Sequence, residues 1–315
     1  MIKQSIIAGA IMALASTAAL AEEKAADPVN TWDVKAFGEV RAFGEMDSRD
    51  NVDSEIKTSD TKFGFKVDGQ AGAVGVFGEL SADVDVNGAS DNVTTRFGYV
   101  GVSIPKIGDI SIGKQMSIQE QFVDKADVFY SAGNNSVQKM DFKQKNSIKY
   151  TNKIAGVEVG ALAAMSDGDA DNDDIDRWQI GAGFMGIGVA VGKDANANEN
   201  YYGVGYSNKF GKIGVAASYS IKDAGTGNSL GNAIMWNSND TTGVTRGIEL
   251  AASYDLSSKI VLEVGYNKTD AAGDDGNIIG EATYKIADNV VAFGNVEMDV
   301  DASDQIARAG VSITF

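Results

Sequence analysis

The chain has 315 residues, with 27 Lys and Arg against 44 Asp and Glu, and it contains no His and no Cys. Without these two residue types, Ser-His-Asp and Cys-His couples, imidazole- or thiolate-ligated metals and disulfides are all excluded. The net charge of −17 argues against a nucleic-acid partner, because binding a phosphate backbone needs a basic surface. Gly accounts for 37 residues, above the usual share of about 7 %. This composition suits a scaffold or a conduit better than an enzyme, and we expect no cofactor.

Residues 1–21 have the character of an export signal. Lys3 is their only charge, residues 6–15 are apolar, and residues 19–21 (ALA) have the small-x-small form of a cleavage site. Cleavage there would leave residues 22–315, which contain no run of 18 apolar residues that could form a transmembrane helix. We therefore expect an exported protein that is periplasmic or secreted, or that crosses a membrane as a closed barrel.

Apolar and polar residues alternate with a period of two along most of the chain. In residues 212–222 (KIGVAASYSIK), the residues Ile, Val, Ala, Tyr and Ile occupy every second position. In later segments the charged residues Glu249, Asp255 and Glu263 all fall on the row opposite to the apolar one. Such segregation is what burial of one face of a β-strand produces.

Sixteen segments with this pattern are predicted strands. They cover residues 33–43, 61–69, 73–83, 94–104, 109–117, 144–152, 156–165, 176–185, 187–193, 200–208, 212–222, 245–256, 258–268, 277–286, 288–298 and 305–315. Short connections such as 68–70, 152–155 and 185–186 alternate with long ones such as 44–60 and 118–143. An even number of strands joined in this way is typical of a bacterial outer-membrane barrel.

The same rows could also build a soluble β-sandwich, although sixteen strands would then need two or more domains. The apolar rows are rich in Ala, Val and Gly, and the eight clearest rows contain no Arg or Lys. Such a residue facing lipid at mid-bilayer would destabilise a barrel by about 2–4 kcal/mol. The sequence therefore predicts an all-β protein, a 16-stranded antiparallel transmembrane β-barrel, with residues 22–315 as its single domain.

Four short motifs, in order along the chain, resemble those of one family. They are residues 62–66 (KFGFK), 95–102 (TRFGYVGV), 108–115 (GDISIGKQ) and 146–150 (NSIKY). Together with the strand count, the alternation of loop lengths and the terminal Phe315, they make the chain similar to the general diffusion porins of Gram-negative outer membranes. The resemblance spans the whole mature chain and implies a homotrimer in the outer membrane, in contact with lipid and lipopolysaccharide.

The resemblance also implies that the third loop, residues 118–143, folds into the barrel and narrows it. Basic side chains of the barrel wall would then face acidic side chains of that loop. The basic residues would be Lys62, Lys66, Arg96, Lys145 and Lys149, and the acidic residues Glu120, Asp124 or Asp127. The chain departs from the enterobacterial pattern at residues 129–133 (FYSAG), which lack Pro-Glu-Phe-Gly-Gly, and at Glu39, where Lys is frequent.

An acidic run between the predicted strands 156–165 and 176–185 invites a calcium interpretation, because alternate Asp side chains can converge on one cation. The candidate ligands are Asp167, Asp169, Asp171 and Asp173. The EF-hand pattern fails, since its sixth position is Asn172 and its twelfth is Trp178. We favour a solvated acidic surface loop over a calcium site, with weak divalent bridging to lipopolysaccharide as a further alternative.

The sequence thus predicts an outer-membrane channel that passes small hydrophilic solutes and ions by passive diffusion. The excess of acidic residues predicts a modest preference for cations. Two alternatives remain: a channel of the same fold that is selective for one substrate, and a surface β-rich binding or adhesion protein without a pore.

Overall fold

The computed structural model describes residues 31–48, 54–85, 92–132, 136–165, 175–224, 243–270, 276–300 and 304–315, and most of these are in β-strands. The predicted export signal at residues 1–21 and the acidic run at residues 167–173 lie outside this part of the chain. Within it, the segments with alternating apolar and polar residues are the strands, because an extended chain points successive side chains to opposite faces.

Most elements follow one another with few residues between them, apart from the longer stretches between α2 and β7 and between β12 and β13. In chain order they are β1 (Thr31–Asp47), β2 (Glu55–Thr58), β3 (Lys62–Ala71), β4 (Val74–Asp85), β5 (Asn92–Ile104), β6 (Gly108–Met116), α2 (Ile118–Phe122), β7 (Lys143–Ile154), β8 (Val157–Met165), β9 (Ile175–Phe184), β10 (Ile187–Asp194), β11 (Glu199–Phe210), β12 (Ile213–Asp223), β13 (Val244–Asp255), β14 (Ile260–Thr269), β15 (Asn277–Ala287), β16 (Val290–Asp299) and β17 (Gln305–Thr314). No helix in the described part of the chain is long and apolar enough to cross a membrane.

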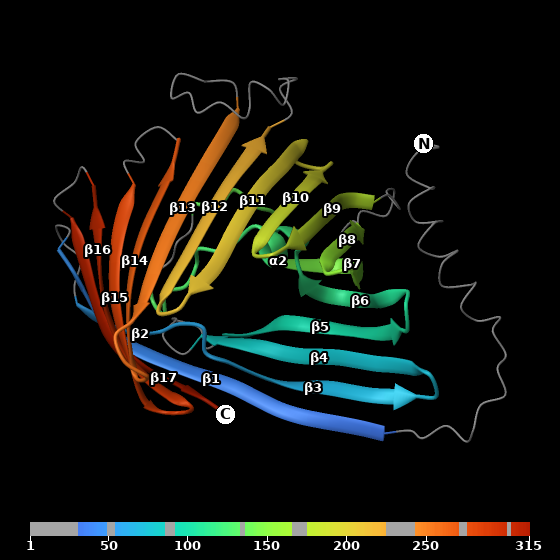
Figure 1. The fold of residues 1–315 in the computed structure, drawn as a ribbon, viewed down its shortest axis with the longest axis horizontal. Coiled ribbons are helices and arrows are strands. Elements are labelled where there is room, and N and C mark those ends of the chain that lie inside the picture. The colour runs from blue at the N-terminus through green and yellow to red at the C-terminus, as the bar shows by residue number, and fades with distance from the viewer. Residues whose placement is uncertain are drawn as a thin grey trace.

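The strands form one closed barrel (Figure 1). Each wall strand pairs antiparallel with its neighbours in the chain, and β1 pairs with both β17 and β3, which closes the sheet. At this closure the backbone N–H of Phe315 donates to the Gly38 carbonyl at 3.1 Å, and the Gly38 N–H donates to the Phe315 carbonyl at 2.9 Å. Closure leaves no strand edge with unpaired backbone groups, as a spanning sheet requires.

Strands β2 and β3 lie along the same edge of β1 and act as one interrupted wall strand. Thr58 of β2 pairs with Ala42, and Lys62 of β3 pairs with Glu39. Three residues, 59–61, therefore stand opposite two residues of β1, and Asp60 among them has φ +49°. This is a β-bulge. The described residues thus form sixteen wall strands, which confirms the predicted number and pairing direction.

Tight turns join the strands at one end of the barrel. Ala155-Gly156 and Met185-Gly186 are two-residue turns with positive φ at both positions, the geometry that matches the twist of a hairpin. The prediction of a turn at residues 68–70 was wrong. Those residues still pair with β4, and the turn comes at Gly72, whose φ of +64° suits glycine.

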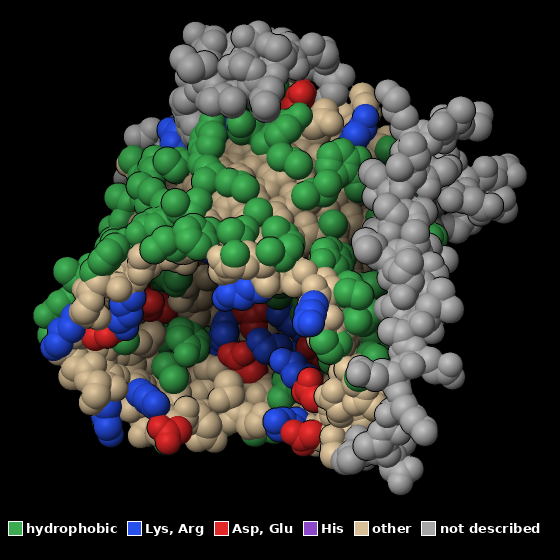
Figure 2. Space-filling view, turned by 45° about the vertical axis from the view of Figure 1, so that its right-hand side comes forward, with side chains coloured by type: hydrophobic (Ala, Val, Ile, Leu, Met, Phe, Trp, Pro, Cys, Tyr) green, Lys and Arg blue, Asp and Glu red, His purple; other side chains and the backbone are tan. Residues whose placement is uncertain are grey.

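The two faces of the barrel wall differ in chemistry. Cross-strand partners share a face, so Glu39, Lys62 and Asp83 lie on one inward-facing row. The outward-facing row carries large apolar side chains such as Leu80 and Val100, which are 64 % and 60 % exposed. Figure 2 shows this apolar outer surface around a hollow that contains Lys, Arg, Asp and Glu side chains. A polar interior and an apolar exterior are the arrangement of a membrane barrel with a wet lumen.

Candidate channel constriction

The segment between β6 and β7, which the structure describes at residues 117–132 and 136–142, folds into the barrel, and we call it the inserted loop. It starts with the short helix α2, for which Ser117 is the N-cap, since its Oγ accepts a hydrogen bond from the Glu120 N–H at 3.1 Å. The helix buries Ile118 and Phe122 against Leu162 of β8 and other apolar residues of the wall. The largest described core cluster of the protein therefore lies inside the barrel, between loop and wall.

One buried side chain of β9 holds both ends of the inserted loop. The Gln179 Oε1 atom accepts hydrogen bonds from the N–H groups of Ile118 at 2.7 Å and Gln119 at 3.1 Å. The Gln119 side chain in turn accepts from the N–H of Met140, on the returning part of the loop, at 2.9 Å. The first and last parts of the loop are thus fixed to each other and to the wall.

Polar side chains of β12, β13 and β15 accept hydrogen bonds from backbone N–H groups in the middle of the loop. The pairs are Lys125 with Ser218 (3.0 Å), Tyr130 with Glu281 (3.0 Å), Val137 with Glu249 (2.8 Å) and Gln138 with Ser220 (2.6 Å). A loop inside a barrel needs such partners, because a buried N–H without one is destabilising. The inserted loop consequently follows one half of the inner wall.

The aromatic side chain of Tyr130, in the middle of the loop, packs against the strands near the closure of the barrel. Its ring stacks on Phe293 of β16, with centroids 5.4 Å apart and an interplanar angle of 17°. The guanidinium of Arg41 on β1 lies 5.0 Å from the Tyr130 centroid and donates a hydrogen bond to the Tyr130 carbonyl. This contact joins the loop to the wall at β16 and β1.

The basic side chains of β1, β3, β5 and β7 near the loop pair with carboxylates of the same wall. The ion pairs are Arg41 with Glu39 (2.6 Å), Lys62 with Glu39 (2.7 Å), Arg96 with Asp83 (2.7 Å), Lys66 with Glu79 (3.9 Å), and Lys143 with Asp83. Of the predicted basic residues, Lys62, Lys66 and Arg96 therefore each pair with a carboxylate of the inner wall, in three separate groups.

The other two predicted basic residues lie on β7. The Lys149 ammonium donates a hydrogen bond to the Met116 carbonyl at 3.1 Å, next to the start of the inserted loop. Lys145 is exposed and follows Gln144, where the pairing of β6 with β7 shifts register. These two residues therefore stand at different heights along β7.

The predicted acidic residues are arranged differently from the expectation. Glu120 and Asp124 both pair with Lys139 of the same loop, the Glu120–Lys139 distance being 2.7 Å. Burial opposes the charge on Lys139, but Asp124 and Glu120 outweigh it and raise the pKa of Lys139 above its usual range. Asp127 is exposed on the loop. The described contacts of Glu120 and Asp124 thus connect two parts of the loop rather than the loop and the basic wall.

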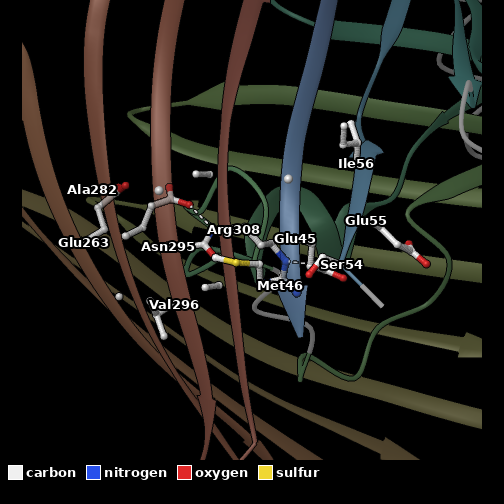
Figure 3. A pocket seen from close by; sticks show the side chains of 16 residues that line it. Glu45, Met46, Ser54, Glu55, Ile56, Glu263, Ala282, Asn295, Val296 and Arg308 are labelled. Carbon is white, nitrogen blue, oxygen red and sulfur yellow. Dashed lines mark hydrogen bonds and ion pairs between the residues drawn. The ribbon is translucent and has the colours of Figure 1, made fainter. Parts of the chain in front are cut away.

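A second ionic cluster lies where β17 and β16 meet β1. Arg308 and Glu45 point toward each other at 2.7 Å, and Arg308 also pairs with Glu297 at 2.8 Å (Figure 3). Lys57 of β2 contacts the other oxygen of Glu45 at 2.6 Å. Arg308 and Glu45 line the inner side of a cavity of about 830 Å³.

Sequence reasoning missed several residues of these networks. Glu39, Arg41 and Asp83 stand on inward-facing rows, so the period of two could have selected them. Lys139 is in the irregular inserted loop, where no period applies, and its partners could not be inferred. In the described part of the chain, no group of three or more acidic side chains is placed to hold a metal ion.

A closed 16-stranded barrel with an apolar exterior, a charged lumen and an inserted loop defines a water-filled channel of an outer membrane. The chain belongs to the Gram-negative porin family, whose profile matches residues 8–301. It is also similar to Outer membrane protein U of Vibrio parahaemolyticus, with 24 % identity over 243 residues, 74 % of this chain and 69 % of that protein.

Solved structures share the fold at low identity. An anion-selective porin from Comamonas acidovorans is 14 % identical, with a TM-score of 0.71 over 90 % of this chain and all of its own. OmpF of Salmonella typhi is 14 % identical, with a TM-score of 0.65 over 90 % of this chain and 97 % of its own. OmpT of Vibrio cholerae, solved in a trimer form, is 15 % identical, with a TM-score of 0.65 over 90 % and 100 %.

Family, fold and lumen together make this protein an outer-membrane porin, a channel for passive diffusion. The predicted family, fold class, location and general function are thereby confirmed. A channel of this kind needs no catalytic group, since the solute gradient drives transport.

Proposed function

We propose that this porin passes small hydrophilic solutes and ions with a modest preference for cations and without enzymatic activity. The observation that carries the proposal is the pairing of the basic wall residues with carboxylates of the same wall. Lys62 and Arg41 share Glu39, and Arg96 and Lys143 share Asp83. These pairs limit the attraction of the wall for anions, and the excess of 44 acidic over 27 basic residues remains.

The basic residues still weaken the preference for cations. Lys62, Lys66, Arg96, Lys145 and Lys149 are proposed as the basic side of the constriction, and Glu120, Asp124 and Asp127 as its acidic side. Because exposed charges are screened beyond about 8–10 Å at physiological salt, the selectivity should fall as the salt concentration rises.

Planar-bilayer recordings test this proposal. In a salt gradient, the reversal potential should show cation preference that shrinks at high salt. Lys62→Gln and Arg96→Gln should each raise the cation preference, since Glu39 and Asp83 lose one of two basic partners. Lys259→Gln, the same charge change in the exposed turn after β13, is the control and should alter it less. Anion preference in the wild type, or unchanged selectivity in the two lumen variants, would contradict the proposal.

We also propose a homotrimer in contact with outer-membrane lipid and lipopolysaccharide. The trimer form solved for OmpT of Vibrio cholerae supports it. So does the outer side of the 830 Å³ cavity, where the outward-facing residues Gly44, Gly280 and Gly294 carry no side chain. In the proposed mature protein, residues 22–315 form one domain after cleavage of residues 1–21.

A further inference from the structure

Glycines occupy the inward-facing positions of the wall strands that lie beneath the inserted loop. We call the following residues of β8, β9, β10, β11 and β14 the glycine seat: Gly160, Gly181, Gly188, Gly203, Gly205 and Gly265. The ladders place the seat on the lumen face, since Gly181 pairs with Gly160 and Gly203 pairs with Ala190. Interior strand positions usually favour larger side chains, so these glycines call for an explanation.

Apolar side chains of the loop fill the space that side chains at the seat would take. A Cβ atom at Gly181 would stand 2.7 Å from side-chain atoms of both Ile118 and Phe122. A Cβ atom at Gly203 would stand 2.6 Å from a Val123 methyl group, and one at Gly265 would stand 2.5 Å from the ring of Phe129. Real Cβ atoms do not approach other carbons so closely, so any larger residue would move the loop or the wall.

At two positions it is the backbone of the loop that comes close. A Cβ atom at Gly188 would collide with the Phe122 carbonyl oxygen, and one at Gly205 with the Val123 carbonyl oxygen. Trimming a loop side chain cannot relieve these collisions. The loop therefore lies with its backbone directly on strands β10 and β11.

The opposite part of the wall offers no such space. Inward-facing positions of β3, β4 and β7 carry the long charged side chains of Lys66, Glu79 and Lys149. A loop packed there would bury these charges, which is strongly destabilising without full pairing. Glycine thus leaves room for the loop on one side of the lumen, and long charged side chains occupy the other.

We propose that the glycine seat positions the inserted loop and so sets the narrowest cross-section of the channel. The seat holds the first part of the loop on the β8–β11 side, and solutes pass along the charged side formed by β3–β7. Larger side chains at the seat lift the loop into the water path. These glycines are positioning residues, since they act on solutes only through the loop.

Compensating substitutions in planar bilayers test the proposal. Gly203→Ala should lower the single-channel conductance, because its methyl group displaces Val123 and the loop with it. Val123→Ala removes the two colliding methyl groups, so the double variant should recover conductance toward the wild type. Gly188→Ala should also lower conductance, and Phe122→Ala should not restore it, because the collision is with a backbone carbonyl.

Gly98→Ala on the outward face of β5 is the matched control. A Cβ atom there would make only ordinary contacts, at 3.7 and 3.9 Å, so conductance should stay unchanged. Wild-type conductance in a folded Gly203→Ala barrel would overturn the proposal, as would a reduced conductance that Val123→Ala fails to raise. Folding of each variant is checked by the shift of the unheated protein on a denaturing gel.

Cysteine labelling tests the position of the loop without relying on conductance. The chain has no Cys, so a single introduced thiol reports alone. Ala190→Cys, buried at 2 % exposure under α2, should resist a water-soluble thiol reagent, whereas Lys66→Cys on the charged side should react rapidly. Equal rates would overturn the proposal. A wild type without conductance steps would instead contradict channel function, and the labelling would still decide where the loop lies.

Discussion

The side-chain carboxamide of Gln179 hydrogen-bonds the first backbone N–H groups of the inserted loop. The residue has no exposed surface, its Oε1 atom accepts from the N–H groups of Ile118 and Gln119, and its Nε2 atom contacts the Met140 sulfur at 3.2 Å. The first N–H groups of a helix have no partner within the helix, and α2 is too short to hold its position unaided. The start of the loop therefore depends on this one wall residue for its position.

Replacing Gln179 by Leu should leave two buried N–H groups without a partner, each at a cost of about 1–3 kcal/mol. We expect brief closures in single-channel recordings to become more frequent, as the loop start leaves the wall. Gln179→Glu keeps an acceptor at the same place and should disturb the recordings less. If the two variants closed equally often, or if the Leu variant closed no more often than the wild type, these hydrogen bonds would not be what holds the loop.

Among the elements, the tight turns show how local sequence chemistry decides strand pairing. Met185 and Gly186 connect β9 and β10 with φ values of +51° and +86°. Residues other than glycine and asparagine adopt this region at a cost, so Met185 is a strained choice. At Gly186 the Ser207 N–H donates to its carbonyl at 2.9 Å, and the Ser207 carbonyl leaves no room for a Cβ atom.

Substitutions in this turn should change barrel stability in opposite directions. Gly186→Ala should lower the free energy of unfolding by about 1–3 kcal/mol, and Met185→Asn should raise it by up to about 1 kcal/mol. Gly211→Ala is a control with the same kind of strain but open space around the Cβ atom, and it should cost less than Gly186→Ala. Urea unfolding of the barrel in lipid vesicles measures all three. If Gly211→Ala lowered the free energy of unfolding as much as Gly186→Ala, the collision with the Ser207 carbonyl would not contribute to the effect at Gly186.

At the scale of the whole molecule, the proposed trimer is tested by mass in mild detergent, where ultracentrifugation should give three chains per particle. A bulky residue at an outward-facing glycine, Gly280→Phe, should shift the particles toward single chains. Ala182→Phe, on the outward row of β9, is the matched control and should leave the trimer intact. Single chains in the wild type, or an effect confined to Ala182→Phe, would contradict a trimer that uses this surface.

Much of the barrel could be predicted from the sequence, because strand periodicity is local. The alternation in residues 212–222 gave the face of every side chain in β12 correctly, and Met185-Gly186 was predicted as a turn. The turn after β3 was predicted too early, since Gly69 resembles a turn residue although it pairs with Val76. Periodicity also placed Lys62 and Lys66 on the lumen face, but it cannot predict which carboxylates they pair with.

The sequence by itself determined the class of fold, the number of wall strands and the inward and outward rows, because a period of two is a property of each extended segment alone. Only the tertiary structure decided where the inserted loop lies and which charges meet. The contacts that fix the loop join residues far apart in the chain, such as Tyr130 and Glu281, which are 151 positions apart. The sequence shows 37 glycines at once, but closure of the barrel decides which of them lie beneath the loop. That placement depends on a surface built from many strands together, and no single strand contains it.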